Sequence, residues 1–472
     1  MAIRFIHKFV IRILLGLLIW VITCGKVSAQ KVRVEDISIE GLRRTRSYIL
    51  ERELSFKKGD SIDLKNITAL FAFNEKRLLN TNLVVEAKFN ITQLDLDRSK
   101  VFIGIRAREG LYLYPAPLLE FLDNDFNKWW RNYNRSFKTL SYGLYAKHIN
   151  LTGNGDEITV YGQAGFTRKV SLEYEYPYLN RSNTIGVGIT AFYAANKEVA
   201  FKTSGNYLQF RRDFDDDLLQ RVKYGLRFTY RPGIYSRHYL LVNFYHFRAS
   251  DSLAYFYNEN FFNGKKRLDF PEFEYAFRFD NRDIIPYAMK GWDVLTYLNK
   301  TGLKKDDLHV LFLGLQASKY QSYNERLSSE SQVFLRYNLD RGKVPYYFNK
   351  AIGYDDIFAR GYEYFVIDGQ DYFLIKNHLR FLFFDRSFDL GRAMILRAYR
   401  VMPVKVFLTA GIDVARVQDN YYYEDNYLAN KFQTGYGLGL DFLFYYNKLL
   451  RFEVSRNNHG MTGFYIHFDA GL

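Results

Sequence analysis

The sequence predicts an all-β transmembrane barrel of sixteen antiparallel strands, preceded by one small α+β domain. The first supporting observation is an alternation of apolar and polar residues that persists over residues 111–472. The second is the aromatic content, 18% with 40 Tyr and 42 Phe, because aromatic residues gather at both ends of membrane-spanning strands. The third is that no apolar run of 18 or more residues follows residue 30, so a chain that crosses a membrane must do so as a closed barrel.

Residues 1–29 have the organisation of a secretory signal peptide. Basic residues up to Arg12 precede the apolar segment Ile13–Ile22, and the small residues 27–29 form a cleavage pattern. The only cysteine, Cys24, lies inside this segment. A lipoprotein would carry its lipid on Cys24, an alternative that the preceding threonine fits poorly. Cleavage after residue 29 would leave a chain without disulfides, as suits a periplasmic or outer-membrane protein.

Residues 30–108 predict the small α+β domain, because the apolar period changes there from two to about 3.6 and back. We expect the order strand, helix, helix, strand, strand, with Thr45 as the cap of the first helix. The predicted elements are a strand at 32–39, helices at 45–54 and 64–79, and strands at Val84–Ile91 and Lys100–Arg106. Either of the last two strands would offer an edge at which a partner strand could add.

Residues 111–472 predict the barrel. In the segment Lys405–Val414, for example, apolar residues at even positions form one face and Asp413 lies on the other. A soluble β-sandwich would also alternate, but the length of the strands, the aromatic strand ends and the unequal loops favour a membrane barrel. Seventeen segments qualify as strands, and a bacterial barrel has an even number. We therefore expect sixteen, with either Asn206–Arg212 or Tyr239–Phe247 belonging to a surface loop.

Charge and motifs exclude several classes of function. The net charge is +15, which suits acidic partners such as lipid headgroups; without a distinct basic cluster, we expect no nucleic-acid partner. We find no nucleophile elbow, no metalloprotease helix, no phosphate loop and no Cys/His metal spacing. The acidic run 213–217 could hold Ca²⁺ or be a solvated loop. We expect no enzyme, no cofactor, no metal site and no catalytic residue.

One short segment places a fixed positive charge among aromatic residues. The segment Phe358–Phe365 reads FARGYEYF and lies between a strand that ends near Asp340 and one that starts near Asp371. An Arg inside a barrel must be hydrated or paired, because burying a lone charge costs several kcal/mol. An inward-facing Asp413 would supply a bidentate partner for Arg360. The alternative is an exposed turn with no special partner.

Three motifs resemble those of the BamA/TamA-type family of outer-membrane assembly and translocation barrels. Residues 37–41, ISIEG, match the opening strand and turn of a polypeptide-transport-associated (POTRA) domain. The tripeptide Arg360-Gly361-Tyr362 matches the hallmark of a long loop that folds back into the lumen. The segment Gly411–Asp413 resembles the inner-wall motif that receives this arginine. The resemblance covers essentially the whole mature chain and implies five strands after the loop.

The sequence also departs from the family pattern. The family usually places a glutamate on the strand after the loop, and our alignment puts His378 there. A neutral histidine could accept a hydrogen bond from Arg360, whereas a charged one would repel it. Ala415 replaces a usual glycine, and only one POTRA-like module is present, whereas BamA-like relatives carry several.

The predicted closing seam lies between the first and last barrel strands. Pro115 and Pro117 fall where the first strand begins, and proline cannot donate to a strand ladder. The last strand carries Phe464, Ile466 and Phe468 on its apolar face. A poorly paired seam would leave an edge that templates an incoming strand, and the resemblance implies a seam that opens sideways. The alternative is that the prolines only stiffen the linker to the barrel.

We therefore expect a non-enzymatic factor of the outer membrane that assembles or translocates polypeptides, with its POTRA-like domain in the periplasm. Its expected partners are unfolded outer-membrane proteins or secreted polypeptides, outer-membrane lipids, and periplasmic or lipoprotein accessory subunits. The alternative is a transport channel gated by the loop around Arg360. A lipid-modifying barrel enzyme is a third possibility, which the absence of a nucleophile motif disfavours.

Overall fold

The computed structural model describes residues 31–121, 140–285, 287–303, 308–354, 357–394, 399–445 and 448–469. The predicted signal peptide and Cys24 lie outside these residues. Among the described residues, no helix has both the length and the apolar character needed to span a bilayer. The described chain divides into two compact units, one formed by residues 31–38, 56–72 and 89–105 and the other by residues 39–55, 73–88 and 106–469.

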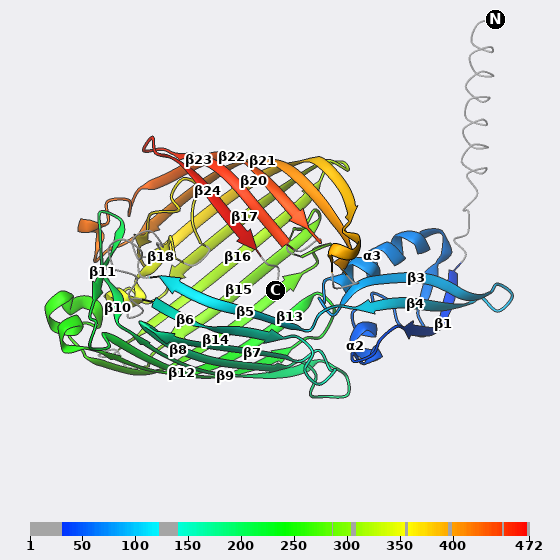
Figure 1. Ribbon diagram of the computed structural model, residues 1–472, viewed down its shortest axis with the longest axis horizontal. Coiled ribbons are helices and arrows are strands. Elements are labelled where there is room, and N and C mark those ends of the chain that lie inside the picture. The colour runs from blue at the N-terminus through cyan, green and yellow to red at the C-terminus, as the bar shows by residue number, and fades with distance from the viewer. Residues whose placement is uncertain are drawn as a thin grey trace, which may run out of the picture. The chain divides into compact units, whose positions relative to one another are not determined.

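The first hundred residues contain a four-stranded sheet of strand order β2-β1-β4-β3 (Figure 1). Its strands are β1 (Lys31–Glu40), β2 (Ser61–Asp63), β3 (Val84–Asp95) and β4 (Lys100–Glu109). Two helices accompany it, α2 (Ser47–Glu51) and α3 (Ile67–Leu79). Within the first unit, β1 and β2 are antiparallel, and the rings of Phe71 and Phe89 stack at 5.3 Å.

Three details of this domain differ from the prediction. The short strand β2 adds an element between the helices. Helix α2 is shorter than expected, and its N-cap is Arg46, which makes no side-chain cap, so Thr45 does not cap it. The strand order places β4 between β1 and β3. The prediction that Lys100–Arg106 could be a free edge is therefore wrong, whereas Val84–Ile91 lies in the edge strand β3.

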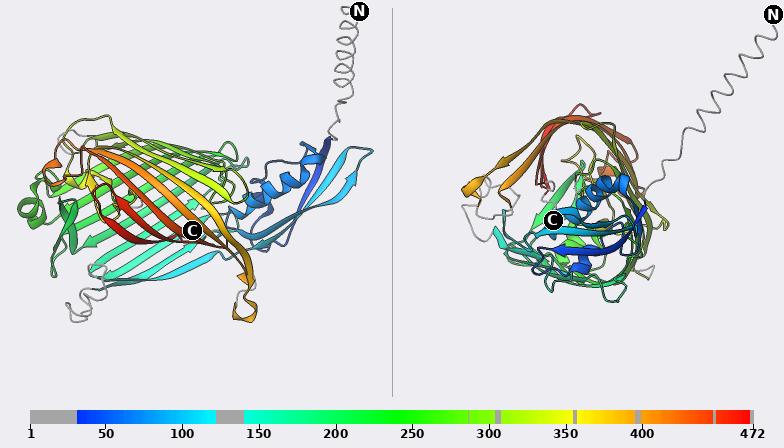
Figure 2. Two further views of the ribbon diagram at one scale, coloured as in Figure 1. Left: turned by 90° about the horizontal axis from the view of Figure 1, so that it is seen from above. Right: turned by 90° about the vertical axis from the view of Figure 1, so that its right-hand side faces the viewer.

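The rest of the second unit is built on one sheet of 16 antiparallel strands, as predicted for the fold class. The sheet curls around a lumen, and its strands are inclined to the axis of the curl (Figure 2). The strands in the first half are β5 (Leu113–Phe121), β6 (Leu140–His148), β7 (Glu157–Gly165), β8 (Thr167–Tyr176), β9 (Ile185–Asn196), β12 (Leu219–Tyr230), β13 (Ser236–Ala249) and β14 (Arg267–Asp280). Those in the second half are β15 (Gly291–Thr301), β16 (Val310–Ser322), β17 (Leu327–Asn338), β20 (Asp371–Asp389), β21 (Val401–Gln418), β22 (Phe432–Phe444), β23 (Lys448–Asn457) and β24 (Thr462–Asp469).

Of the two segments that competed for the last place among the sixteen predicted strands, only one is a wall strand. Tyr239–Phe247 lies inside the barrel strand β13, which pairs with β12 and β14. Asn206–Arg212 contains β11 (Tyr207–Arg212), whose pairing partner among the described strands is β10 (Glu198–Ser204), in a separate two-stranded hairpin. The alternating pattern was therefore correct about strand structure in both segments, but β11 is not part of the wall.

The outer face of the wall is apolar. Large hydrophobic side chains are exposed on nearly every strand, and on β22 they alternate with glycines that face the lumen; examples are Leu226, Phe244, Leu313, Leu379, Ile412 and Leu438. Buried polar residues such as Asp413, Asp441 and Glu453 instead occupy alternate positions of the same strands. An apolar surface of this extent is unstable in water, so the outer face needs an apolar environment.

Candidate functional site: the luminal seat of Arg360

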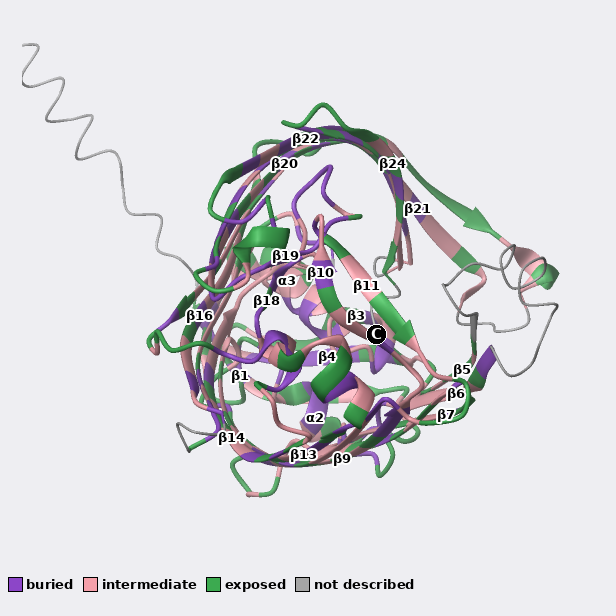
Figure 3. Cartoon of the chain, turned by 90° about the vertical axis from the view of Figure 1, so that its left-hand side faces the viewer, coloured by how far each residue is buried: buried purple, intermediate pink, exposed green. Residues whose placement is uncertain are grey.

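The segment between β17 and β20 enters the lumen. It contains the short strands β18 (Lys350–Ile352) and β19 (Ile367–Asp368), which pair with each other and lie within the ring of wall strands (Figure 3). Arg360 is only 3% exposed, and Tyr362 is only 1% exposed. The alternative of an exposed turn around Arg360 therefore does not hold.

A glycine turn brings Arg360 against the wall. Gly361 has φ +77°, and a Cβ on it would lie 2.9 Å from backbone atoms of Arg456 and Asn457. The Asn457 side chain donates a 2.7 Å hydrogen bond to the Gly361 carbonyl, and the Tyr362 hydroxyl contacts Asn458. Only glycine adopts this backbone conformation freely at such a close approach, which explains the Arg-Gly pair.

The guanidinium of Arg360 contacts two carboxylates. Its Nη1 donates to Asp413 Oδ1 at 2.9 Å, and its backbone N–H donates to the other oxygen of Asp413, also at 2.9 Å. Its Nε donates to Glu453 Oε1 at 2.8 Å. Asp413 is fully buried and Glu453 nearly so. These charge-assisted bonds fix both the position and the orientation of the loop tip.

His378 is the third partner of Arg360. Its Nε2 contacts Arg360 Nη2, and its Nδ1 lies 3.3 Å from Glu330 Oε2. A guanidinium only donates hydrogen bonds, so Nε2 must be the acceptor and the proton must be on Nδ1, which donates to Glu330. In this arrangement the imidazole of His378 is neutral, which is the state in which a histidine at this position can accept a hydrogen bond from Arg360.

Cations and carboxylates are paired around the seat, the group of inner-wall residues that surrounds the Arg360 side chain. Four buried or nearly buried cations face four carboxylates on the inner wall. The cations are Arg360, Lys376, Arg380 and Arg451, and the carboxylates are Glu330, Asp413, Asp441 and Glu453. Each carboxylate has at least one cation within 4 Å. Such pairing offsets the desolvation that an isolated buried charge would suffer.

Glycines of the wall make room for the arginine. A Cβ at Gly435 would lie 1.7 Å from the Arg360 carbonyl oxygen, and one at Gly411 would lie 1.9 Å from its Nη1. A Cβ at Gly437 would lie 2.9 Å from the Cδ of Arg360. The glycines that alternate along β22 therefore form a recess for the loop tip.

Two residues of the seat were not predicted. Glu453 lies on β23 and Glu330 on β17. The alternation of Arg451, Glu453 and Ser455 with apolar residues could have placed Glu453 on the inner face. Its contact with Arg360 depends on the register across three strands, which a single sequence does not provide.

The predicted seam residues lie on two edges of the sheet. Strand β5 pairs only with β6, and β24 pairs only with β23, so over the described residues the two strands do not pair with each other. Pro115 and Pro117 are exposed on β5. Phe464, Ile466 and Phe468 are 56%, 59% and 70% exposed on β24. The structure thus places the named residues on the two edge strands of the described sheet.

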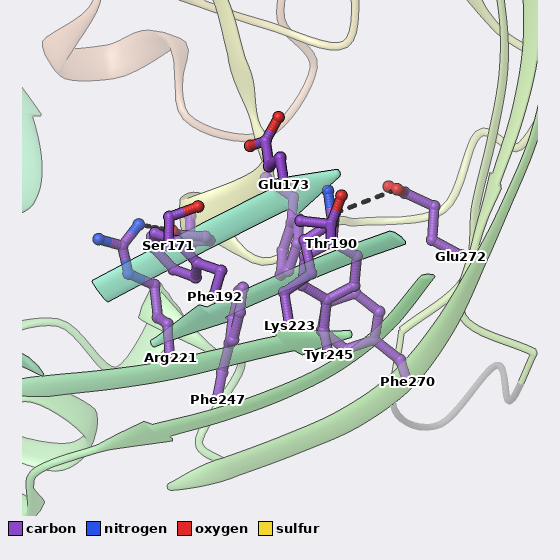
Figure 4. Close-up of a pocket in the computed structure, with 12 residues that line it drawn as sticks. Ser171, Glu173, Thr190, Phe192, Arg221, Lys223, Tyr245, Phe247, Phe270 and Glu272 are labelled. Carbon is purple, nitrogen blue, oxygen red and sulfur yellow. Dashed lines mark hydrogen bonds between the residues drawn. The ribbon is translucent and has the colours of Figure 1, made fainter. Parts of the chain in front are cut away.

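A second luminal feature is a cavity of about 390 Å³ against the opposite wall (Figure 4). Aromatic side chains form part of its lining, together with the charged Glu173, Arg221, Lys223 and Glu272. Tyr245 donates a hydrogen bond to Glu272 at 3.2 Å. The described residues contain no cluster of His, Cys, Asp and Glu that could hold a metal.

The chain is similar to known proteins in sequence over its first domain and in structure over most of its length. Residues 32–110 match the family model described as POTRA, surface antigen variable number repeat. BamA from Haemophilus ducreyi lacking POTRA domains 1-3 has a similar structure, with a TM-score of 0.50 and 14% identity over 93% of this chain and 84% of that chain. CdiB from Escherichia coli follows, with a TM-score of 0.49 and 10% identity over 94% of this chain and 91% of that chain. No curated protein matches the sequence.

The class of protein follows from the fold. The chain has a POTRA domain and a 16-stranded barrel sheet of the BamA type. The predicted fold class is therefore confirmed, and the predicted resemblance is confirmed for the POTRA domain and for the fold of the barrel.

Proposed function

We propose that this protein is a non-enzymatic factor of the outer membrane that inserts or translocates polypeptides. The observation that supports the proposal is that, over the described residues, the sheet of 16 strands is not closed: its two edge strands, β5 and β24, do not pair with each other. Unpaired edges present backbone donors and acceptors that an extended chain can satisfy. The proposed clients are unfolded outer-membrane proteins or secreted polypeptides.

The outer face supports the location. Its exposed apolar side chains suit the hydrocarbon of a bilayer, and the polar inner face suits a water-containing lumen. The POTRA domain would then lie in the periplasm, where β3 offers an edge for a client strand. Lipids and periplasmic or lipoprotein subunits are further proposed partners.

The proposal is tested by reconstitution. We expect liposomes that contain the full mature protein to accelerate the folding of an unfolded, unrelated outer-membrane barrel, compared with liposomes that lack the protein. Depletion from cells is expected to lower the amounts of several unrelated barrels. Folding at the unassisted rate, together with unchanged barrel levels after depletion, would contradict an assembly role.

A transport channel is the second candidate, because the cavity of Figure 4 lies in the lumen and carries charged and aromatic groups. A channel would conduct ions in planar bilayers, and its depletion would abolish the passage of one solute or protein while other barrels persist.

A further inference from the structure

Basic and aromatic side chains meet at one end of the wall. The order of the strands in the sheet follows the chain, and all neighbours are antiparallel. Strands β17 and β21 therefore end, and β20 and β22 begin, at the end of the wall opposite to the start of β5, which we call the far rim. Tyr337, Phe373, Arg416 and Phe432 lie on the outer face near this rim, each on a different one of these four strands. Aromatic residues at strand ends are typical of the level at which a barrel meets lipid headgroups.

Arg416 is at the centre of this group. It is exposed, whereas its neighbours Ala415 and Val417 are buried, so its side chain lies on the outer face. Its direct cross-strand partners are Phe373 and Phe432. The guanidinium carbon lies 5.2 Å from the centre of the Phe432 ring, and the two phenylalanine rings are 6.0 Å apart in an edge-to-face arrangement. The ring thus positions the cation and leaves its N–H donors unused.

The donors of Arg416 have no acceptor among the described residues. No described carboxylate lies within 4 Å of its guanidinium, nor of the ammonium of Lys431, which is exposed directly before β22. Arg341 is exposed at the same rim but differs from both, because it is paired with Asp371. Two cations of the far rim therefore remain available to an anion from outside the described chain.

An exposed arginine without an ion pair is ordinary where it faces water. Here the outward residues along the same strand and its neighbour are apolar, since Ile412 and Leu438 are 54% and 69% exposed. Arg416 therefore lies where the apolar band of the wall ends. At such a boundary, the methylenes of a long side chain stay on apolar surface while its charge reaches the headgroups. The anions available at that level are lipid phosphates.

We propose that the far rim binds the phosphate-bearing headgroup of a glycolipid, through Arg416 and Lys431. This inference rests on the proposed function, which sets the protein in the outer membrane, and adds a ligand that the insertion of polypeptides does not by itself require. A guanidinium binds phosphate through two parallel N–H···O bonds, and an ammonium adds a second positive charge. The far rim lies away from the start of β5, which follows the POTRA domain in the chain. A periplasmic POTRA domain thus places the far rim in the outer leaflet.

The aromatic residues favour a glycolipid over a phospholipid. The rings of Tyr337 and Phe432 are 50% and 55% exposed on either side of Arg416. Such rings offer apolar faces against which the carbon-bound hydrogens of a sugar can pack, while the hydroxyl groups of the sugar remain in water. A phospholipid headgroup has no ring to fill that space.

Native mass spectrometry of the detergent-solubilised mature protein measures this binding. The probe is lipid A that carries both of its phosphates, added over a range of concentrations. We expect Arg416→Gln to weaken binding about tenfold, the loss that removal of a charged hydrogen-bonding group produces. Lys431→Gln is expected to weaken it further in the double variant. Arg416→Lys keeps the charge without the paired donors, and we expect an intermediate loss.

Lys319 provides a matched control at the opposite rim. It is also exposed on the outer face, and its ammonium lies 5.2 Å from the centre of the Trp292 ring. Lys319→Gln removes one charge from a pair of the same chemistry, and we expect less than a twofold change in binding. Heat-modifiability on gels verifies that each variant is a folded barrel.

The outcomes separate the possible ligands. Lipid A without phosphates is expected to bind the parent protein and Arg416→Gln equally weakly. Parent-like binding of the phosphorylated probe by Arg416→Gln would overturn the proposal, and equally tight binding of phosphatidylglycerol would overturn the assignment of a glycolipid. Dimers of the parent that disappear in Arg416→Gln, with lipid binding intact, would also overturn it, because the far rim would then join two copies of this chain. Unassisted client folding with intact lipid A binding contradicts only the proposed function.

Discussion

At the scale of single residues, Arg360 is distinguished by its surroundings more than by its charge. A buried guanidinium needs a partner at several of its donors, and here Nε, Nη1 and Nη2 each have one on a different strand. Lysine could not reproduce this geometry, because its ammonium is a single point of charge. The loop tip is therefore held by one side chain that contacts β20, β21 and β23.

Removal of the Asp413 charge tests this arrangement. We expect Asp413→Asn to lower the free energy of unfolding by about 3 kcal/mol, because it leaves part of the charge of Arg360 unpaired in a buried position. Heat-modifiability of the detergent-solubilised barrel on gels measures the effect. Asp385→Asn removes a carboxylate from an exposed pair with Lys405, and we expect that control to cost less than about 1 kcal/mol.

An exchange of charges is expected not to restore stability. In Arg360→Asp with Asp413→Arg, the new carboxylate would face Glu453, which now binds the arginine Nε. Full recovery in the double variant would show that Glu453 does not matter to the seat.

A substitution at Gly435 tests the recess for the loop tip by adding side-chain volume without changing any charge. A methyl group there would overlap the Arg360 carbonyl, so we expect Gly435→Ala to displace the loop and to make residues 343–366 sensitive to added protease. Gly162→Ala is the matched control, because a Cβ on this strand glycine meets no atom within 4 Å. Equal protease resistance of the two variants would contradict the proposed recess.

The sequence could predict part of this site. Alternation alone placed Asp413 on the inner face, and the resemblance paired it with Arg360. Glu453 and Glu330 come from strands whose relative register is set by many hydrogen bonds across the sheet. The neutral state of His378 likewise depends on which groups face its two nitrogens.

At the scale of elements, the turn of the hairpin β10–β11 is hydrogen-bonded to the luminal segment, which is the part of the chain between β17 and β20. Asn206 has φ +63° and is fully buried. Its side chain donates to the Val366 carbonyl at 2.9 Å and accepts the N–H of Leu428 at 3.0 Å. One asparagine thus joins the hairpin, the luminal segment and the β21–β22 loop.

We expect Asn206→Ala to lower the free energy of unfolding by about 1–3 kcal/mol, because two buried backbone groups lose their partner and the left-handed conformation becomes strained. Asn183→Ala is the control, since Asn183 has a similar φ of +52° in an intermediate-exposure turn, and we expect a smaller loss there. Thermal unfolding of both variants in detergent measures the difference. Similar losses would mean that the backbone conformation, and not the hydrogen bonds, dominates.

The elements themselves were largely predictable, because a period of two over long segments has few structural explanations. The exceptions have local causes. Strand β11 alternates like a wall strand but pairs only with its neighbour β10. The central place of β4 in the front sheet is a matter of strand order, which local periodicity does not contain.

At the scale of the whole molecule, the described wall strands form a sheet with two edge strands, β5 and β24, and the described residues of the segment 343–366 occupy part of its lumen. Deletion of that segment tests the channel alternative. If the segment closes a pore, conductance in planar bilayers is expected to rise at least severalfold on deletion, because a wide polar lumen would then be open to ions.

The parent protein and the Asp385→Asn variant serve as controls, and heat-modifiability verifies that the deleted form is still a barrel. Unchanged low conductance after deletion would count against a channel that this segment gates. High conductance of the parent protein would show that the segment leaves a pathway open.

The position of Glu453 and Asn457 near the end of the chain has a consequence for biogenesis. Arg360 precedes both by more than ninety residues. Its guanidinium therefore stays hydrated until β23 has joined the wall. A nascent barrel that stalls before β23 would retain an untethered luminal segment. Seating of Arg360 therefore reports that β20, β21 and β23 have all taken their places in the wall.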